Sequence, residues 1–174
     1  MDPIPPTTPI TPIVPLHSIT PLPRSPEFRP SGATAERFDA NIARLSAGFG
    51  LKRLGCNVTV LPPGKAAFPM HSHRANDELF LILAGSGELR LGAARHAVKQ
   101  GDLIGCPAGN TSTAHQLINT GEVELRYLAV SSTLDPEICE YPDSGKVGAY
   151  CGDEVTGLEH LTRYADQVDY WDRE

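Results

Sequence analysis

The sequence predicts an all-β protein, a barrel or sandwich built of short strands. Between residues 51 and 130, apolar residues recur with a period of two in short runs, and glycine, proline, asparagine or aspartate separates one run from the next. Many short strands at short intervals are typical of β-barrels and β-sandwiches. The 174 residues suffice for one domain with a buried core, so we do not expect a second full domain.

The strand runs can be placed in order along the chain. The first puts Leu54, Cys56, Val58 and Val60 on one face and ends at the turn residues 62–64. Further strands are expected at residues 78–83, 87–91, 96–98, 103–106, 115–119 and 122–130.

A short helix is expected ahead of these strands, over residues 33–46. Phe38, Ile42 and Leu45 recur at the spacing i, i+4 and i+7, which is typical of one helix face. The pattern stops before Gly48, a residue that favours a helix end.

The two ends of the chain differ in composition from its middle. Ten of the 16 prolines fall within residues 1–30, which favours extended backbone. We therefore interpret residues 1–32 as an arm, residues 33–132 as the β-domain with its short helix, and residues 133–174 as a C-terminal extension packed on that domain. The arm is either disordered or packed on its own barrel or a partner subunit, because it carries Ile4, Ile10, Ile13, Val14, Leu16, Ile19 and Leu22. The side chains expected to anchor the extension are Leu158, Leu161, Tyr164, Val168, Tyr170 and Trp171.

Charge and hydropathy exclude several classes of partner. The net charge of −6 offers no basic stripe for the phosphates of a nucleic acid. The longest apolar run, residues 79–84, is far too short to cross a bilayer. The N-terminal stretch has Asp2 and repeated prolines, unlike a signal peptide, so we expect a cytoplasmic protein. The four cysteines contain no CxxC pair and are expected to be reduced and mostly buried.

A metal site is indicated by histidine spacing. His71 and His73 are one residue apart, so both imidazoles lie on the same face of an extended strand. Residues 74–77 have turn composition, and we expect them to place Glu78 across a hairpin from His73. His115 begins a later strand and can complete the set from across a barrel.

This pattern resembles the two motifs of the cupin superfamily. The first is His71-x-His73, four residues, Glu78, six residues and Gly85. The second is Gly101, five residues, Pro107-Ala108-Gly109, then His115, three residues and Asn119, with five residues instead of the usual two between Gly109 and His115. The resemblance covers about residues 50–131. It implies a small antiparallel β-barrel of the double-stranded β-helix or jelly-roll type. We also expect a homodimer, because open antiparallel sheets leave edges and faces that need covering.

The resemblance also implies that His71, His73, Glu78 and His115 bind one divalent metal ion inside the barrel. Three neutral imidazoles and one carboxylate suit Zn, Fe, Mn, Ni, Co or Cu, whereas Ca and Mg prefer sites built of oxygen. Four protein ligands leave one or two positions open for water or substrate if the ion is five- or six-coordinate. The alternative is a barrel whose histidines are satisfied core groups, or whose metal serves stability alone.

Small cupins that carry a stretch like EYPDSGK at residues 140–146 resemble sugar-phosphate isomerases. The leading interpretation is therefore a metal-binding cupin that acts on a small polar metabolite, with sugar or sugar-phosphate isomerisation as its reaction. Two alternatives stay open. One is an Fe-dependent dioxygenase with the same ligands, and the other is a non-catalytic module that binds or senses a small molecule.

Several residues have narrower interpretations. His96 and Tyr127 are the candidates for a general base. Asn119 is interpreted as a turn residue and Cys106 as a small buried apolar residue. The basic residues that could bind a phosphate, if one faces the cavity, are Lys65, Arg74, Arg90 and Arg126.

Overall fold

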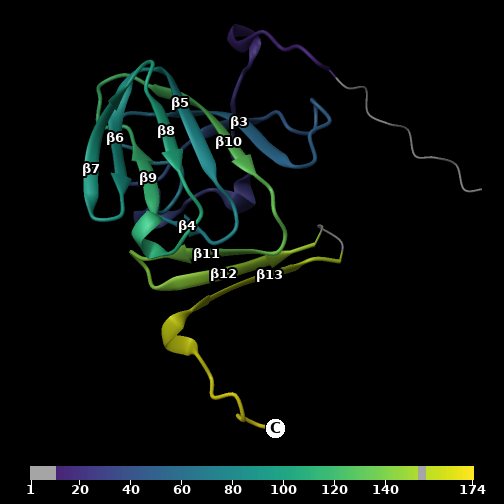
Figure 1. The fold of residues 1–174 in the computed structure, drawn as a ribbon. Helices are drawn as coiled ribbons and strands as arrows, with labels where there is room; N and C mark the ends of the chain where they lie inside the picture. The colour runs from purple at the N-terminus through teal and green to yellow at the C-terminus, as the bar shows by residue number, and fades with distance from the viewer. Residues whose placement is uncertain (1–10, 153–155) are drawn as a thin grey trace, which may run out of the picture.

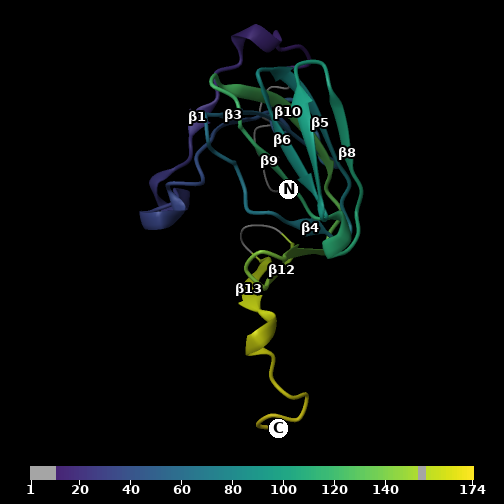
Figure 2. The same ribbon diagram turned by 90° about the vertical axis from the view of Figure 1, so that its left-hand side faces the viewer.

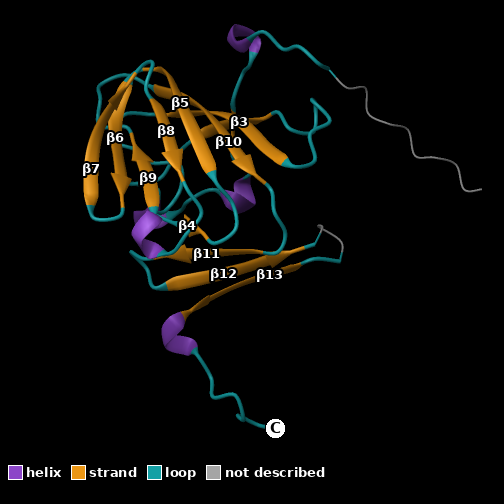
Figure 3. Cartoon of the chain, in the orientation of Figure 1, coloured by secondary structure: helices purple, strands orange, loops and turns teal. Residues whose placement is uncertain are grey.

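The computed structural model describes residues 11–152 and 156–174, and within them the fold is all-β without an α-helix (Figure 1, Figure 3). The all-β prediction is thus confirmed. The strands are β1 Leu22–Pro23, β2 Asn41–Arg44, β3 Leu54–Leu61, β4 Ser72–His73, β5 Glu78–Ala84, β6 Ser86–Leu91, β7 Ala94–Lys99, β8 Leu103–Cys106, β9 His115–Ile118, β10 Leu125–Ser132, β11 Glu137–Tyr141, β12 Lys146–Cys151 and β13 Leu158–Arg163. Single turns of 3₁₀-helix occur at Leu16–Ser18, Pro26–Phe28, Gly32–Thr34, Thr111–Thr113 and Tyr164–Asp166.

The strands form three antiparallel sheets. Their orders are β1-β2-β3-β10-β5-β8, β7-β6-β9 and β13-β12-β11-β4. The first two make the walls of the barrel, which Figure 2 shows from the side. The third lies across one end, with β4 on the barrel side and β13 farthest from the barrel (Figure 1).

The core lies between the walls of the barrel. Alternate residues of β5, β6, β9 and β10 point inward, as period-two patterning requires. Leu61, Ile82 and Leu125 are among the most deeply buried side chains. The second half of β3 is buried on both faces, because Thr59 and Leu61 point opposite to Val58 and Val60 and all four are covered.

The predicted helix over residues 33–46 is wrong. A 3₁₀ turn occupies Gly32–Thr34, and Asn41–Arg44 form strand β2 between β1 and β3. Ile42 lies opposite Thr59 and packs against the core from a strand. Pairing with a long neighbouring strand outweighs a weak local helical pattern here, since helix propensity is only a small preference.

The described part of the N-terminal arm lies against its own barrel. Ile19 is buried, and its carbonyl oxygen accepts a hydrogen bond from Arg126 Nη2 at 2.9 Å. Strand β1 pairs Leu22 with Ile42. Arg24 Nη2 donates to the carbonyl of Ala67 at 2.8 Å. Ile4 and Ile10, two of the apolar residues noted in the arm, lie outside the described residues.

The C-terminal extension differs from its expectation. It contributes strands β11, β12 and β13, which the sequence patterns did not predict. The side chains expected to anchor it are wrong in that role, because they are largely exposed: Leu158, Leu161, Tyr164, Val168, Tyr170 and Trp171. Strand β11 makes the contact with the barrel instead, through its pairing with β4. No helix in the described parts of the chain is long and apolar enough to span a membrane.

Candidate metal centre

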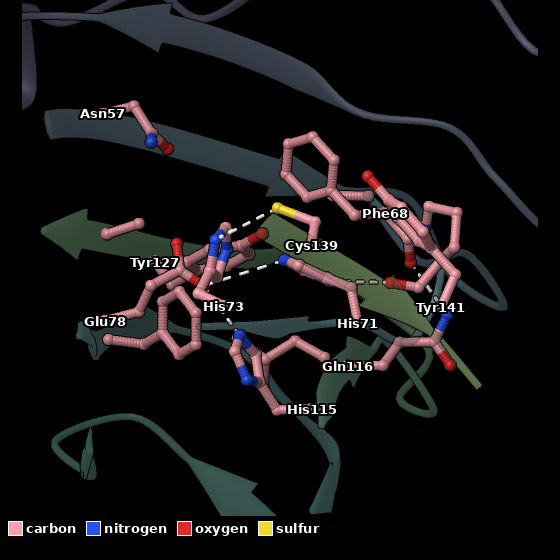
Figure 4. A pocket seen from close by; sticks show the side chains of 15 residues that line it. Asn57, Phe68, His71, His73, Glu78, His115, Gln116, Tyr127, Cys139 and Tyr141 are labelled. Atoms are coloured by element: carbon pink, nitrogen blue, oxygen red, sulfur yellow. Dashed lines mark hydrogen bonds and ion pairs between the residues drawn. The ribbon is translucent and has the colours of Figure 1, made fainter. Parts of the chain in front are cut away.

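The end of the barrel that faces β11 contains a cavity of about 300 Å³. The four residues His71, His73, Glu78 and His115 all line it, together with apolar and aromatic side chains (Figure 4). The sequence-predicted set therefore meets in one chamber.

Three separate backbone segments bring the four side chains together. His71 and His115 face each other in an antiparallel bridge, with N–O distances of 3.1 and 2.8 Å in the two directions. His73 belongs to β4 and lies opposite Cys139 of β11. Glu78 begins β5. The expected hairpin between His73 and Glu78 is wrong, since β4 pairs with β11 and β5 pairs with β10 and β8. The loop of residues 74–77 nevertheless returns Glu78 to the chamber.

One carboxylate oxygen is the point of convergence. Glu78 Oε2 lies 2.6 Å from His115 Nε2, 3.6 Å from His73 Nε2 and 3.8 Å from His71 Nε2. Ligand atoms around one transition metal, each about 2.0–2.2 Å from the ion, lie about 3 Å or more from one another. The spacing of these donors is close to that of a coordination sphere. Donor atoms of His71, His73 and Glu78 all lie within 4.8 Å of one another.

Each imidazole turns its other nitrogen outward. His71 Nδ1 lies 2.8 Å from the carbonyl oxygen of Pro69, and His115 Nδ1 lies 3.3 Å from that of Thr113. A carbonyl oxygen accepts only, so the proton of the neutral ring is on Nδ1 in both residues. The Nε2 atoms then face the chamber, and each has a lone pair for a ligand when its ring is neutral. Outer hydrogen bonds of this kind fix the tautomer and orientation of histidines that bind metals.

His73 is held from its outer side by two residues that the sequence analysis missed. Its Nδ1 lies 3.3 Å from Cys139 Sγ and 3.5 Å from Glu137 Oε2. Burial, followed by the charges of Glu137 and Glu78, raises the pKa of the Cys139 thiol to about 12. Cys139 is therefore a neutral thiol near pH 7. His73, Glu137 and Cys139 form a second group of donor atoms close enough to hold an ion.

The remaining wall is aromatic and polar. Tyr141 stacks on His71 with ring centroids 6.2 Å apart, and Tyr127 meets Phe80 edge-to-face at 5.7 Å. Burial raises the pKa of both tyrosines, so both hydroxyls stay protonated. His96 lies exposed on β7 and does not line the chamber. Of the two candidate bases, only Tyr127 faces the site.

Two interpretations of neighbouring residues are confirmed. Asn119 is fully buried and closes a turn: its amide donates to the carbonyls of Leu61 and Val123, and its oxygen accepts from Gly121 N. Cys106 is a buried member of the hydrophobic core, and its thiol also interacts with His115.

The electrostatics of the chamber depend on the pair of His115 and Glu78. Burial lowers the pKa of His71 to about 4, helped by the charge of His115. Burial acts the same way on His115, but hydrogen bonds with Cys106 and Glu78 outweigh it and raise the pKa of His115 to about 10. Burial works to raise the pKa of Glu78, yet the hydrogen bond from His115 and the charges of the three histidines hold it below its usual value. The metal-free chamber therefore holds an imidazolium–carboxylate pair near neutral pH.

Metal binding is therefore expected to release a proton. A metal can take the Nε2 position of His115 only when that nitrogen has lost its proton, so below pH 10 affinity should rise about tenfold per pH unit, with about one proton released per ion. The low pKa of His71 means that it is already neutral at pH 7 and adds nothing to this release. Calorimetry in buffers of different ionisation enthalpy measures the proton count. An affinity that does not change between pH 6 and pH 8 would contradict the pairing.

Comparison with known proteins agrees with this fold. The family model described as the cupin domain matches residues 57–131. The matched segment runs from β3 to β10, and the barrel around it has the cupin arrangement. Residues 57–131 thus match a cupin domain.

Two solved structures and two curated proteins are similar to particular parts of the chain. A sugar phosphate isomerase of the cupin superfamily from Silicibacter pomeroyi has TM-score 0.74 and 24% identity, covering 92% of this chain and 98% of that one. A protein provisionally named a sugar phosphate isomerase, from Acidithiobacillus ferrooxidans, has TM-score 0.67 and 25% identity, covering 75% and 80%. An uncharacterized protein from Methanocaldococcus jannaschii is 34% identical over 47% of this chain, and an oxalate-binding protein from Thermotoga maritima is 33% identical over 40%. The chain spans 65% and 54% of the lengths of these last two, less than two thirds of either.

Proposed function

We propose that His71, His73, Glu78 and His115 bind one divalent transition metal ion, and that the protein uses it to isomerise a sugar or sugar phosphate. The observation that carries the metal site is the convergence of three Nε2 atoms on Glu78 Oε2, with the outer nitrogens held by Pro69, Thr113 and the Cys139–Glu137 pair. The donor set suits Zn, Fe, Mn, Ni or Co.

The chemistry follows from what the lining residues can do. When bound, the ion would supply a Lewis acid that polarises a carbonyl oxygen of the substrate. Tyr127 and Tyr141 keep their protons, so their hydroxyls are suited to orient substrate oxygens as hydrogen-bond donors. Among the described lining residues Glu78 is the one carboxylate, and its lowered pKa keeps it ionised. Its second oxygen, Oε1, would move the proton between neighbouring carbons.

Structural likeness supports the isomerase as the leading reaction. The protein from Acidithiobacillus ferrooxidans is 25% identical and carries that name, and the one from Silicibacter pomeroyi shares the fold over nearly its whole length. The likeness to an oxalate-binding protein supports a second candidate, a module that binds a small carboxylate without turning it over. The homodimer expected from the sequence stays a prediction.

A metal and oxygen matrix tests the reaction class. Chelator-treated protein is reloaded with Zn²⁺ or with Fe²⁺ and incubated with a panel of sugars and sugar phosphates, in air and under nitrogen. We expect a product of unchanged mass and shifted retention, formed with Zn²⁺ under nitrogen, because a Lewis acid needs no oxygen. His115→Ala should abolish this turnover, while the exposed His96→Ala should leave it intact.

Three results would contradict the isomerase. Product that gains oxygen atoms only in air with iron would assign an oxygenase. Saturable binding of oxalate with no turnover of any compound would assign the binding module. Turnover unaffected by His115→Ala would place the reaction outside the chamber.

A further inference from the structure

A second cavity, of about 450 Å³, lies beside the metal chamber on the outside of the barrel. Its walls come from the outer side of β6, β7 and β9, from residues 34–38 of the N-terminal segment, and from the turn that joins β11 to β12. Its lining includes four basic side chains, Arg37, Arg90, Arg95 and Lys146. Asp143 is the single carboxylate among the described residues that line it. We call this cavity the basic pocket.

The positive charge of the basic pocket is only partly neutralised. Asp143 forms a two-pronged ion pair with Arg90, at 2.8 Å to Nη1 and 3.0 Å to Nη2. Arg95 pairs with Glu88, which is not part of the lining. The charges of Arg37 and Lys146 are not neutralised by these two ion pairs. The pocket is thus locally positive in a chain whose net charge is −6.

Arg37 and Lys146 contact aromatic rings and leave their charges free for a ligand. The Arg37 guanidinium lies 5.1 Å from the Phe38 ring, and Lys146 Nζ lies 5.1 Å from the Tyr141 ring. In the described parts of the chain, no carboxylate lies within ion-pair distance of either group. A ring face holds a cation in place without cancelling its charge. The hydrogen bond from Arg90 lowers the pKa of Asp143, and the charges of Arg37 and Arg95 act in the same direction. All three guanidinium groups are therefore close enough to Asp143 to act on its carboxylate.

Two residues lie between the basic pocket and the metal chamber. Gln116 lines both cavities, as does Pro69. The Gln116 amide donates to the carbonyl of Phe68 at 2.8 Å, and its Oε1 accepts from Arg90 Nη1 at 2.9 Å. Figure 4 shows Gln116 among the side chains around the histidine cluster. An anion held by the pocket would therefore lie next to the chamber, across this amide.

The metal chamber itself has no basic side chain other than its histidines among the described lining residues. Three of the four basic residues considered from the sequence are engaged elsewhere: Lys65 with the carbonyls of Ala35 and Glu36, Arg74 with Glu140, and Arg126 with the carbonyls of Leu16 and Ile19. Arg90 is the fourth, and it lines the basic pocket. Of these four, Arg90 is therefore the residue available to a phosphorylated ligand beside the chamber.

We propose that the basic pocket binds a phosphate group, with Arg37 and Lys146 as its cationic contacts, and with Arg90 and Arg95 recruited from Asp143 and Glu88. Guanidinium forks and an ammonium suit the oxygens of a phosphate dianion. Phosphate binding rests on the pocket alone. That the phosphate belongs to the substrate of the neighbouring chamber rests on the proposed function.

Titration with inorganic phosphate tests the pocket. The protein is first treated with chelator, so that phosphate cannot bind to a metal, and binding is followed by calorimetry at low ionic strength. We expect saturable binding that the double variant Arg37→Gln/Lys146→Gln weakens about tenfold or more, because two charge-assisted contacts are lost. The matched control is Lys52→Gln/Arg53→Gln, which removes the same charge from exposed residues outside the pocket and should change affinity little.

A variant that gains affinity tests whether misfolding explains the weaker binding of the double variant. Asp143→Asn removes the carboxylate that competes for Arg90, so phosphate should bind severalfold more tightly, by roughly the effect of one charged partner. A misfolded protein would not gain affinity. Wild-type protein without saturable phosphate binding, or equal losses in the pocket and control double variants, would overturn the proposal.

A second arm separates this proposal from the isomerase. In metal-loaded protein, the pocket double variant should raise KM for a sugar phosphate and leave KM for the unphosphorylated sugar unchanged. If phosphate binds and the pocket double variant weakens that binding, but no sugar phosphate is turned over, the phosphate site is supported and the isomerase is rejected. Isomerase activity whose KM for sugar phosphate is the same in wild type and in the pocket variant would sustain the isomerase and reject the pocket as its phosphate site.

Discussion

Glu78→Ala is expected to leave the purified protein almost free of transition metal, whereas the wild type should carry about one ion per chain. The change removes the carboxylate on which three imidazole nitrogens converge and leaves His115 without the partner at 2.6 Å. Loss of an outer-sphere partner alone weakens metal binding about 10- to 100-fold, so the loss of a ligand should exceed that range. Elemental analysis of protein purified without chelator measures the content directly.

The thermal stability of the same variant should follow its metal content. Metal that binds the folded state alone stabilises it by about 4 kcal/mol at a free concentration of 1,000 times Kd. Wild-type protein should therefore lose much of its stability when chelator is added, and Glu78→Ala should respond little.

Two further variants separate metal binding from folding. Glu78→Gln keeps the size and one acceptor oxygen of the side chain but removes its charge, and it should also lose most of the metal. His96→Ala removes an exposed imidazole outside the chamber and should retain a full complement. Full metal content in Glu78→Ala, or equal depletion in His96→Ala, would refute the assignment of the site.

The part of the site that lies within the matched cupin segment could be predicted from the sequence. His71, His73 and Glu78 fall within eight positions of one another, so strand alternation and one turn suffice to bring them together. His115 could be added because the second motif, although it is stretched before His115, keeps the spacing from His115 to Asn119. The predicted hairpin between His73 and Glu78 was wrong, because the strand that carries His73 pairs with β11 and not with β5.

The outer wall of the chamber could not be predicted in this way. Cys139 lies 66 residues beyond His73 in the chain, and no periodic pattern links the two. Pairing between distant strands is decided by the whole fold, which local periodicity does not encode. The same holds for residues 41–44, where pairing with β3 overrode a helical spacing. The stretch at residues 140–146 gave one signal, because it spans the end of β11 and the turn to β12 and includes Tyr141 of the chamber.

Glu137 connects that outer wall to the ligands, and Glu137→Ala should cost the protein both stability and metal affinity. Its Oε1 accepts hydrogen bonds from the backbone nitrogens of Arg74 at 2.9 Å, Ala75 at 3.2 Å and Ile138 at 2.8 Å, and its Oε2 contacts Asn76 Nδ2. The carboxylate thus holds the loop that joins His73 to Glu78. Arg74 N keeps the carbonyl of Ile138 as an acceptor and Asn76 Nδ2 keeps that of Leu134, so the backbone nitrogens of Ala75 and Ile138 are the ones that lose this partner. An unpaired donor costs about 1–3 kcal/mol, so a loss of about 2 kcal/mol or more in the free energy of unfolding is expected.

The metal should respond in the same variant, because Glu137 Oε2 also lies 3.5 Å from His73 Nδ1. Freed from this contact, the His73 ring is no longer held toward Glu78, and metal affinity should fall about 10- to 100-fold. Urea unfolding measures the first effect and titration with Co²⁺, read from its visible spectrum, the second. Glu137→Gln retains an acceptor for the three backbone nitrogens and should recover much of the stability. Glu159→Ala, on the exposed strand β13, is the matched control and should change neither quantity. Unfolding and Co²⁺ affinity in Glu137→Ala equal to those of this control would show that the carboxylate does not position the loop.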